Sequence, residues 1–149
     1  MKALSIMPEF AHFIFTGEKT VECRTWNTNF RGEFLVCATK DRVPGFISGH
    51  AWFTVVLKDV VPFTKAHLAD AMMEDMPTEK CYAWILEEPT LIYPIPVRGM
   101  PGLFDVDDSL IRYPDDEVPE DAPEDELLKR YAEFEEKYLI PITYIPAQL

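Results

Sequence analysis

The junction between a predicted helix and a predicted strand, at residues 17–24, constrains the fold of this chain more than any other segment. Before it, Pro8 suits the first turn of a helix, and apolar residues recur at helical spacing as far as Ile14. Gly17 supplies the usual stop of such a helix. After it, residues 20–26 alternate polar and apolar side chains, which indicates a half-buried strand. The chain therefore turns directly from a helix into a strand.

This junction carries charged side chains where apolar ones would be expected. Thr20, Glu22 and Arg24 fall on one face of the predicted strand, and apolar residues fall on the other. Glu22 and Arg24 are thus neighbours, close to Lys19 at the mouth of the turn. Because unneutralised charges are costly to bury, such groups suit a cleft that receives a polar ligand. The plainer alternative is a surface ion pair between Glu22 and Arg24, with Lys19 in solvent.

Strands outnumber helices in the rest of the chain. Further strands are indicated at 2–6, 33–39, 50–61, 81–86 and 91–97. A helix is predicted from an N-cap at Thr64 to about Asp75, and residues 40–49 form a loop. This pattern predicts a β-rich, mixed α+β fold, namely a small, partly open β-barrel with peripheral helices.

The C-terminal part of the chain differs in composition. Residues 107–123 are acidic and rich in proline, which is typical of an extended or mobile connection. From residue 124 an amphipathic helix is indicated, and a short strand is predicted at 140–145. The apolar face of this helix consists of Leu127, Leu128, Tyr131, Phe134 and Tyr138. The predicted organisation is a domain at 1–106, a connection at 107–123, and a C-terminal helix and strand at 124–149 that pack on the domain.

The negative charge of the chain is concentrated in one region. The net charge is −12, and fourteen of the 26 Asp and Glu residues lie between positions 105 and 136. The remainder is nearly neutral, whereas nucleic-acid binders usually present a basic face. This pattern argues against tight, non-specific binding of long RNA or DNA and favours a small ligand or a local contact. The acidic helix has an alternative role as an arm that binds a basic protein partner.

Cysteine and histidine usage limits the chemistry of the chain. Cys23, Cys37 and Cys81 are odd in number and widely spaced, which argues against a disulfide framework and predicts a cytoplasmic protein. Cys37 is interpreted as a small buried residue, with a nucleophilic pair with His50 as an alternative. No metal-ligand spacing occurs, so we expect neither a metal nor another cofactor. No apolar stretch approaches the ~20 residues of a membrane span, and no secretory leader is evident.

A signature run and four ordered blocks around it resemble a known family. The run Gly17-x-Lys19-x-x-Glu22-x-Arg24 resembles the G-x-K-x-x-x-x-R signature of the ASCH domain family, a branch of the PUA-like superfamily. Residues 4–11 precede the signature in family order, and residues 31–38, 82–87 and 94–99 follow it. The resemblance covers residues 2–106 and implies a PUA-like barrel that binds RNA or a nucleoside-type ligand.

The resemblance also implies an enzymatic alternative. Some small members of the family hydrolyse N4-acylated cytidines with the signature Lys, a Thr three residues later and a Glu from a later strand. Lys19 matches the Lys, but Glu22 occupies the Thr position. Glu87 and Glu88 are candidates for the distant Glu by order alone. The alternative functions are therefore a metal-independent ribonuclease, an N4-acylcytidine amidohydrolase, or an interaction module that uses the acidic C-terminal arm.

The predicted site combines three candidate catalytic groups with four ligand-binding ones. The catalytic candidates are Lys19, Glu22 and Arg24, and the ligand-binding candidates are Arg31, Trp26, Tyr82 and Arg98. Arginines can hold phosphate or carboxylate groups bidentately, and aromatic faces can stack a base. The alternative role of the aromatic residues is packing in the core, and the alternative role of Arg98 is to form part of a turn. The expected partner is single-stranded RNA or a modified nucleoside, bound in a weak or local contact. No contact with a membrane is expected.

Overall fold

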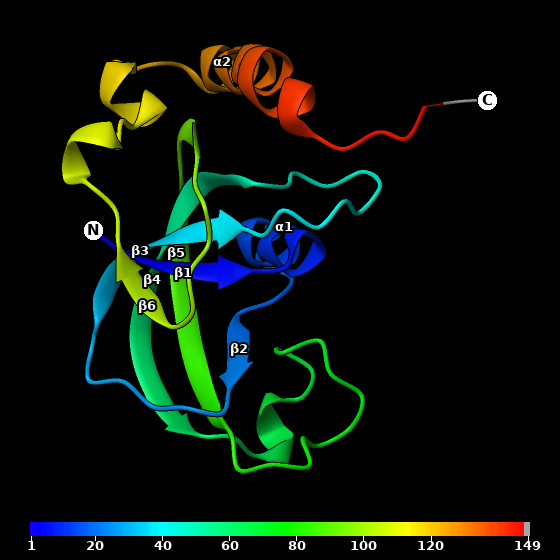
Figure 1. The fold of residues 1–149 in the computed structure, drawn as a ribbon. Coiled ribbons are helices and arrows are strands. Elements are labelled where there is room, and N and C mark those ends of the chain that lie inside the picture. The colour runs from blue at the N-terminus through cyan, green and yellow to red at the C-terminus, as the bar shows by residue number, and fades with distance from the viewer. Residues whose placement is uncertain (148–149) are drawn as a thin grey trace.

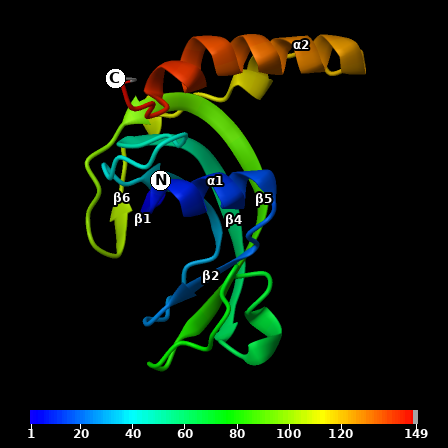
Figure 2. The ribbon, with the colours of Figure 1, turned by 90° about the vertical axis from the view of Figure 1, so that its right-hand side faces the viewer.

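A curled six-stranded sheet with one helix against it and another beyond its rim forms the structure (Figures 1 and 2). The computed structural model describes residues 1–147. The strands are β1 (Lys2–Ile6), β2 (Val21–Arg24), β3 (Gly32–Ala38), β4 (His50–Pro62), β5 (Tyr82–Pro96) and β6 (Leu103–Asp105), and the α-helices are α1 (Pro8–Thr16) and α2 (Glu124–Phe134). Within residues 1–147, no helix is long and apolar enough to cross a bilayer.

The strand order is β2-β5-β4-β3-β1-β6, with β1 and β3 parallel and the other neighbours antiparallel. The two strands predicted at 81–86 and 91–97 are one continuous strand, β5, so that part of the prediction was wrong. Register shifts between β4 and β5 absorb the irregular residues, among them Glu88 with a φ of 53°. Such bulges increase twist and bend, which lets this long pair curl the sheet.

One face of the sheet, called here the inner face, packs against α1. The main core lies there and includes Phe34 and Trp84 of the sheet with Ala11 and Ile14 of the helix. Two smaller clusters cover the opposite face. The predicted fold class, a β-rich mixed α+β fold with a partly open barrel, peripheral helices and a C-terminal helical extension, is confirmed.

The first helix begins and ends as predicted. Pro8 occupies its first turn, and Gly17 caps its C-terminus with a φ of 84° and an N–H that donates to the Ile14 carbonyl at 3.2 Å. The Lys19 N–H then donates to the Phe13 carbonyl at 2.9 Å. These bonds turn the chain sharply from α1 towards β2 and hold Lys19 close to the helix.

The helix predicted from Thr64 to about Asp75 is wrong. Only one turn forms, η1 (Lys65–His67), and turns and bends follow. The Asp70 carbonyl accepts the N–H groups of Thr20 and Val21 at 3.0 and 3.1 Å, and Met72 has a φ of 57°. Because the backbone of this segment binds the start of β2, it does not continue as a helix.

The C-terminal region runs across the sheet and then along its rim. Residues 107–123 contain two short turns, η2 (Asp108–Leu110) and η3 (Pro114–Glu117). The helix predicted from residue 124 is confirmed as α2, which continues into η4 (Glu135–Leu139). The strand predicted at 140–145 is wrong, since η5 (Ile140–Ile142) with Pro141 in its turn occupies this place. The division at residues 106 and 123 stays a prediction.

The predicted apolar face of α2 is only half buried. Phe134 is buried in the main core, and Tyr138 packs beside it. Leu127 and Leu128 are 44% and 65% exposed. The helix therefore contacts the rest of the protein mainly through its C-terminal end.

Candidate functional site

Three charged side chains converge at the start of β2, and we call them the charged cluster: Lys19, Glu22 and Arg24. Nζ of Lys19 is 3.8 Å from Oε1 of Glu22, and Nη2 of Arg24 is 3.7 Å from Oε2 of the same carboxylate. The Glu22 side chain is 12% exposed and the Arg24 side chain 26%. One carboxylate therefore lies between two cations in a largely desolvated setting.

Lys19 is buried, so the alternative that placed it in solvent is wrong. Its side chain is 5% exposed, Nζ donates to the Ala71 carbonyl at 2.8 Å, and Nζ lies 5.4 Å from the centre of the Phe10 ring. Burial lowers the pKa of Lys19 below its usual value of 10.5, and the neighbouring Glu22 carboxylate only partly opposes this shift. The amine thus loses its proton more readily than that of an exposed lysine.

Arg24 has a free donor inside the protein. Nη2 donates to the Ser5 carbonyl at 3.0 Å, but the buried Nε has no hydrogen-bond partner within residues 1–147. Oε2 of Glu9 is likewise buried and unpartnered in this part of the chain. Glu9 lies in the first turn of α1, which begins shortly after Ser5. A buried polar group without a partner is unfavourable, so an acceptor that reached Arg24 Nε would be stabilised.

The pairing of β2 with β5 sets the surroundings of the cluster. Glu22 is opposite Trp84, and Arg24 is opposite Tyr82, so these side chains share the inner face. Trp84 is fully buried, and its Nε1 donates to the Trp26 carbonyl at 3.4 Å. The Trp26 ring packs edge-on against Trp84 with centroids 4.8 Å apart. Trp26 therefore supports the core here, whereas Tyr82 is partly exposed beside Arg24.

The structure does not bring the other two predicted arginines into the cluster's contacts. Arg31 is exposed, with Nη2 3.5 Å from Oδ1 of Asp59, and its Nη1 donates to the carbonyls of Thr28 and Phe30. Arg98 is exposed in the loop after β5. Both are therefore separate surface cations in this arrangement.

Other candidates from the sequence occupy structural positions. Glu87 forms an ion pair with Lys58 at 3.7 Å, and Glu88 is exposed at an irregular position within β5. Burial raises the pKa of the Cys37 thiol to about 12, and Nδ1 of His50 contacts the Ser48 carbonyl at 2.8 Å. The thiol therefore stays protonated and unreactive. Over residues 1–147, no group of three or more His, Cys, Asp or Glu residues is arranged to hold a metal ion.

Sequence reasoning missed the backbone acceptors of the cluster. The carbonyls of Ser5 and Ala71 come from β1 and from the loop after η1, and no side-chain pattern marks them. Glu9 carried a weak signal, since an acidic residue follows Pro8 in the first helical turn. Phe10, an apolar residue of the first helix, is 36% exposed, and its ring faces the Lys19 ammonium.

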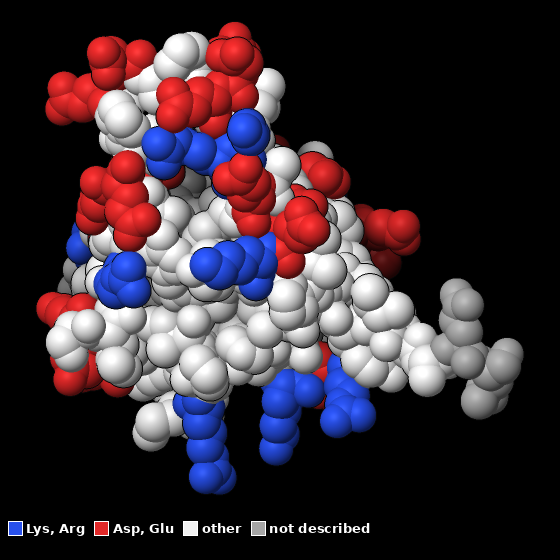
Figure 3. Space-filling model, turned by 90° about the horizontal axis from the view of Figure 1, so that it is seen from above, with Lys and Arg blue, Asp and Glu red and all other residues white. Residues whose placement is uncertain are grey.

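The charge of the protein surface is uneven. In the view from above, Asp and Glu side chains occupy much of the upper part of the face, with some Lys and Arg side chains among them, and further Lys and Arg side chains project from the lower edge (Figure 3). The acidic residues between positions 105 and 136 belong to the segment that carries α2. A polyanion would therefore meet repulsion at the C-terminal region.

Comparisons with known proteins agree with this architecture. The ASCH domain model matches residues 4–137, which extends past the region of sequence resemblance into the C-terminal helix. The crystal structure of ASCH from Zymomonas mobilis aligns with a TM-score of 0.58 and 20% identity, over 72% of this chain and 88% of that chain. A Tyr-to-Phe mutant of that protein aligns at 21% identity over 74% and 97%, again with a TM-score of 0.58. These identities show a shared fold, and no curated protein matches the chain.

Proposed function

The chain belongs to the ASCH domain family, and from this premise we propose that it binds a nucleoside unit at the charged cluster. The unit is either a free modified nucleoside or part of a short single-stranded RNA. The observation that carries the proposal is the buried Nε of Arg24, a donor without a partner within residues 1–147 beside the Glu22 carboxylate.

The donors and acceptors of the cluster suit the edge of a base. Arg24 Nε can donate to a ring nitrogen or carbonyl, and the Glu22 carboxylate can accept from an amino group. Tyr82, opposite Arg24 on the inner face, offers a partly exposed ring on which the base would stack. Base–aromatic stacking contributes roughly 1–3 kcal/mol per base.

The charge distribution supports a short ligand. The cluster contains two cations, and salt would weaken binding with a log–log slope of only about −1.4 if both neutralised phosphates of a single strand. The acidic C-terminal segment would repel a longer strand. A nucleoside or an oligonucleotide of a few residues fits both features.

The experiment compares binding by the wild type and by Arg24→Lys. A fluorescently labelled single-stranded pentaribonucleotide and free N4-acetylcytidine serve as the two probes. Arg24→Lys keeps the positive charge but removes Nε, so we expect affinity for the bound probe to fall about tenfold. Lys58→Ala, which removes an exposed cation paired with Glu87, is the matched control and should bind as the wild type does. Equal affinities of wild type and Arg24→Lys for both probes would exclude this site.

A hydrolytic function is the second candidate, favoured by the lowered pKa of Lys19. A neutral amine can accept a proton, as a general base must. With RNA, Lys19 would take the 2′-hydroxyl proton while the 2′-oxygen attacks phosphorus. The P–O5′ bond would break, and the departing 5′-oxygen would take up a proton from water. With an N4-acylcytidine, it would take a proton from the water that attacks the acyl carbon. The bond from that carbon to N4 would then break, and the protonated amine would return the proton to N4.

The two candidates are separated by turnover. Product analysis of the RNA probe should show a 2′,3′-cyclic phosphate end, and N4-acetylcytidine should yield cytidine and acetate. Activity that persists in a chelator and disappears in Lys19→Ala and Glu22→Gln would support the enzyme. Binding without any product over a range of RNAs and acylated cytidines would contradict the enzyme and support only the binding function.

A further inference from the structure

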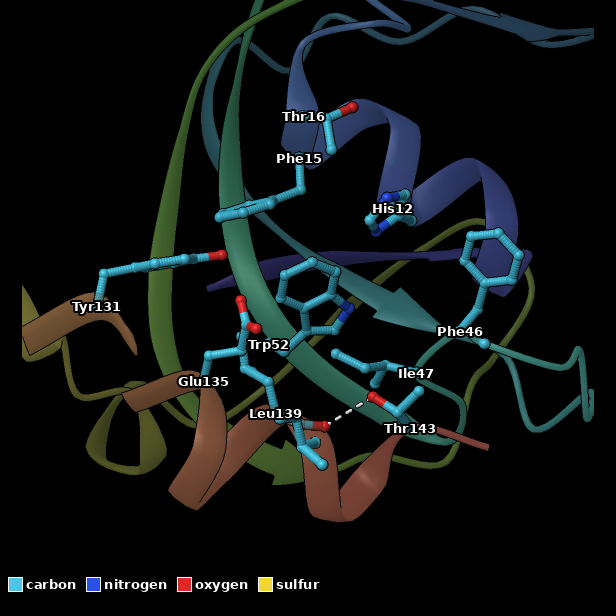
Figure 4. Close-up of a pocket in the computed structure, with 12 residues that line it drawn as sticks. His12, Phe15, Thr16, Phe46, Ile47, Trp52, Tyr131, Glu135, Leu139 and Thr143 are labelled. Carbon is cyan, nitrogen blue, oxygen red and sulfur yellow. Dashed lines mark hydrogen bonds between the residues drawn. The ribbon is translucent and has the colours of Figure 1, made fainter. Parts of the chain in front are cut away.

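We propose a second ligand site, in a cavity of about 250 Å³ where α1, the loop before β4, and the C-terminal helical turns meet (Figure 4). Its ligand class is a flat, single-ring heteroaromatic amine that offers both a hydrogen-bond acceptor and an amino group. The cavity is separate from the charged cluster, because its lining includes none of Lys19, Glu22 and Arg24.

Trp52 is directed into the cavity by an irregularity in the sheet. In the β3–β4 ladder, Val36 pairs with Phe53 and Cys37 pairs with Ala51, so Trp52 is an extra residue without a partner in β3. A bulge of this kind turns a side chain out of the regular alternation, and such bulges are frequent next to functional sites. The rings of Trp52 and Phe53 consequently lie close together, with centroids 4.6 Å apart.

The indole of Trp52 has an unused donor. The residue is 3% exposed, and its buried Nε1 finds no hydrogen-bond partner in the part of the chain that the structure describes. Figure 4 shows this nitrogen on the side of the indole towards His12 and Ile47. Buried Trp N–H groups usually find a partner, so this one points to an acceptor that the site would receive.

The walls of the cavity suit a ring. Phe15 packs against Trp52 with centroids 4.7 Å apart, and Phe46 stands 5.3 Å from the His12 ring. Pockets for drug-sized ligands usually measure ~300–1,000 Å³, so a smaller cavity fits one ring and its substituents. Tyr131 lines the cavity and is 40% exposed, so this wall borders solvent.

The remaining polar groups define the charge of the ligand. Among the lining residues, which the structure describes completely, Glu135 is the only acid, and none is Lys or Arg. The Thr143 hydroxyl already donates to the Leu139 carbonyl at 2.8 Å. Glu135 and Tyr131 approach from the side of the C-terminal helices, opposite His12 (Figure 4). A ring acceptor would bind Trp52 Nε1, the negative charge of Glu135 would attract an amino group in the same cavity, and an anion would be repelled.

The experiment uses 2-aminopyridine as the probe and benzoate as an anion of similar size. In ¹H–¹⁵N spectra, titration with 2-aminopyridine should shift the Trp52 indole N–H saturably, and benzoate should not. Trp52→Phe identifies that resonance among the three Trp indoles. A Trp52 resonance unmoved by saturating 2-aminopyridine would overturn the site, and an equal shift with benzoate would overturn the ligand class.

Adjacent glutamates supply matched variants. Glu135→Gln removes the cavity carboxylate without changing the side-chain shape, so 2-aminopyridine should bind about tenfold more weakly. Glu136→Gln, one residue further on and exposed, does not line the cavity and should bind as the wild type does. Both positions lie outside the buried core, and unchanged thermal unfolding would show that both variants fold. An equal loss of affinity in both variants, or no loss in either, would contradict the proposal.

Discussion

Lys19 and Glu22 form an ion pair, with Nζ and Oε1 3.8 Å apart, although their side chains are only 5% and 12% exposed. The pair spans the turn between α1 and β2, and it is also contacted by the Ala71 carbonyl, by Arg24 and by the Cys23 N–H, which donates to Glu22 Oε1 at 3.1 Å. Charged groups are costly to desolvate, so a buried pair adds little net stability to the folded protein. Removal of one partner is nevertheless strongly destabilising, because the other charge stays buried without compensation.

Glu22→Gln should destabilise the protein more than Lys19→Met. The first substitution leaves two partly buried cations without their shared carboxylate, and loss of one partner of a buried pair costs about 3 kcal/mol. The second leaves Glu22 paired with Arg24 and fills a similar volume with an apolar chain. Urea unfolding of both variants and of the wild type measures the difference, and equal free energies of unfolding for the two variants would contradict this ranking.

Stability should depend on pH through Lys19. Its pKa is lowered in the folded protein, so between that value and the usual 10.5 the unfolded chain binds more protons. The unfavourable contribution of the buried cation is fully present below the folded pKa and is relieved as the pH rises towards 10.5. The free energy of unfolding of the wild type, relative to Lys19→Met, should therefore increase from pH 7 to pH 10.5. A flat or falling difference would contradict the lowered pKa.

Phe134→Ala should destabilise the whole protein, whereas Leu128→Ala should not. Phe134 is 8% exposed, and its ring packs 5.4 Å from Tyr93 and 4.9 Å from Tyr138, measured between centroids. Truncation of such a residue costs about 3 kcal/mol. Leu128, on the same helix but 65% exposed, should change the free energy of unfolding by less than about 0.5 kcal/mol. Chemical denaturation distinguishes the two, and a small loss for Phe134→Ala would mean that α2 is dispensable for the fold.

Gly17→Ala should cost about 1 kcal/mol through backbone strain alone. The residue has a φ of 84°, and an added Cβ would meet no heavy atom within 4 Å in the described part of the chain. Gly17→Asn should cost less, because Asn tolerates the left-handed conformation better. Thermal unfolding of the two variants gives the comparison, and equal losses would indicate a cause other than φ.

Much of the fold is predictable from local patterns. The helix over Pro8–Thr16, with its Gly17 cap, and the alternation in β2 depend on residues a few positions apart, and both are confirmed. The helix predicted after Thr64 is wrong because the Asp70 carbonyl accepts backbone N–H groups at the start of β2. These hydrogen bonds join residues about 50 positions apart, so local patterns do not indicate them. For the same reason β5 continues through Glu88, since its pairing with β4 outweighs the local break.

The candidate site likewise has a part that local patterns predict and a part that they do not. The spacing of Lys19, Glu22 and Arg24 placed these residues together, because a turn followed by a strand brings their side chains to one face. Arg31 lies apart from them because it directly precedes β3, which pairs with β4, and there it contacts Asp59 of β4. No local pattern could have indicated that partner.

The sequence by itself therefore determined the elements whose geometry is local: where the first helix stops, and which face of the following strand is charged. The tertiary structure alone decided which of those charges are buried and which polar groups, among them Arg24 Nε and Trp52 Nε1, lack a partner within residues 1–147. The physical reason is that burial and hydrogen-bond satisfaction depend on atoms contributed by distant segments. Those atoms are assembled only when the sheet curls around α1 and the C-terminal helix packs against its rim.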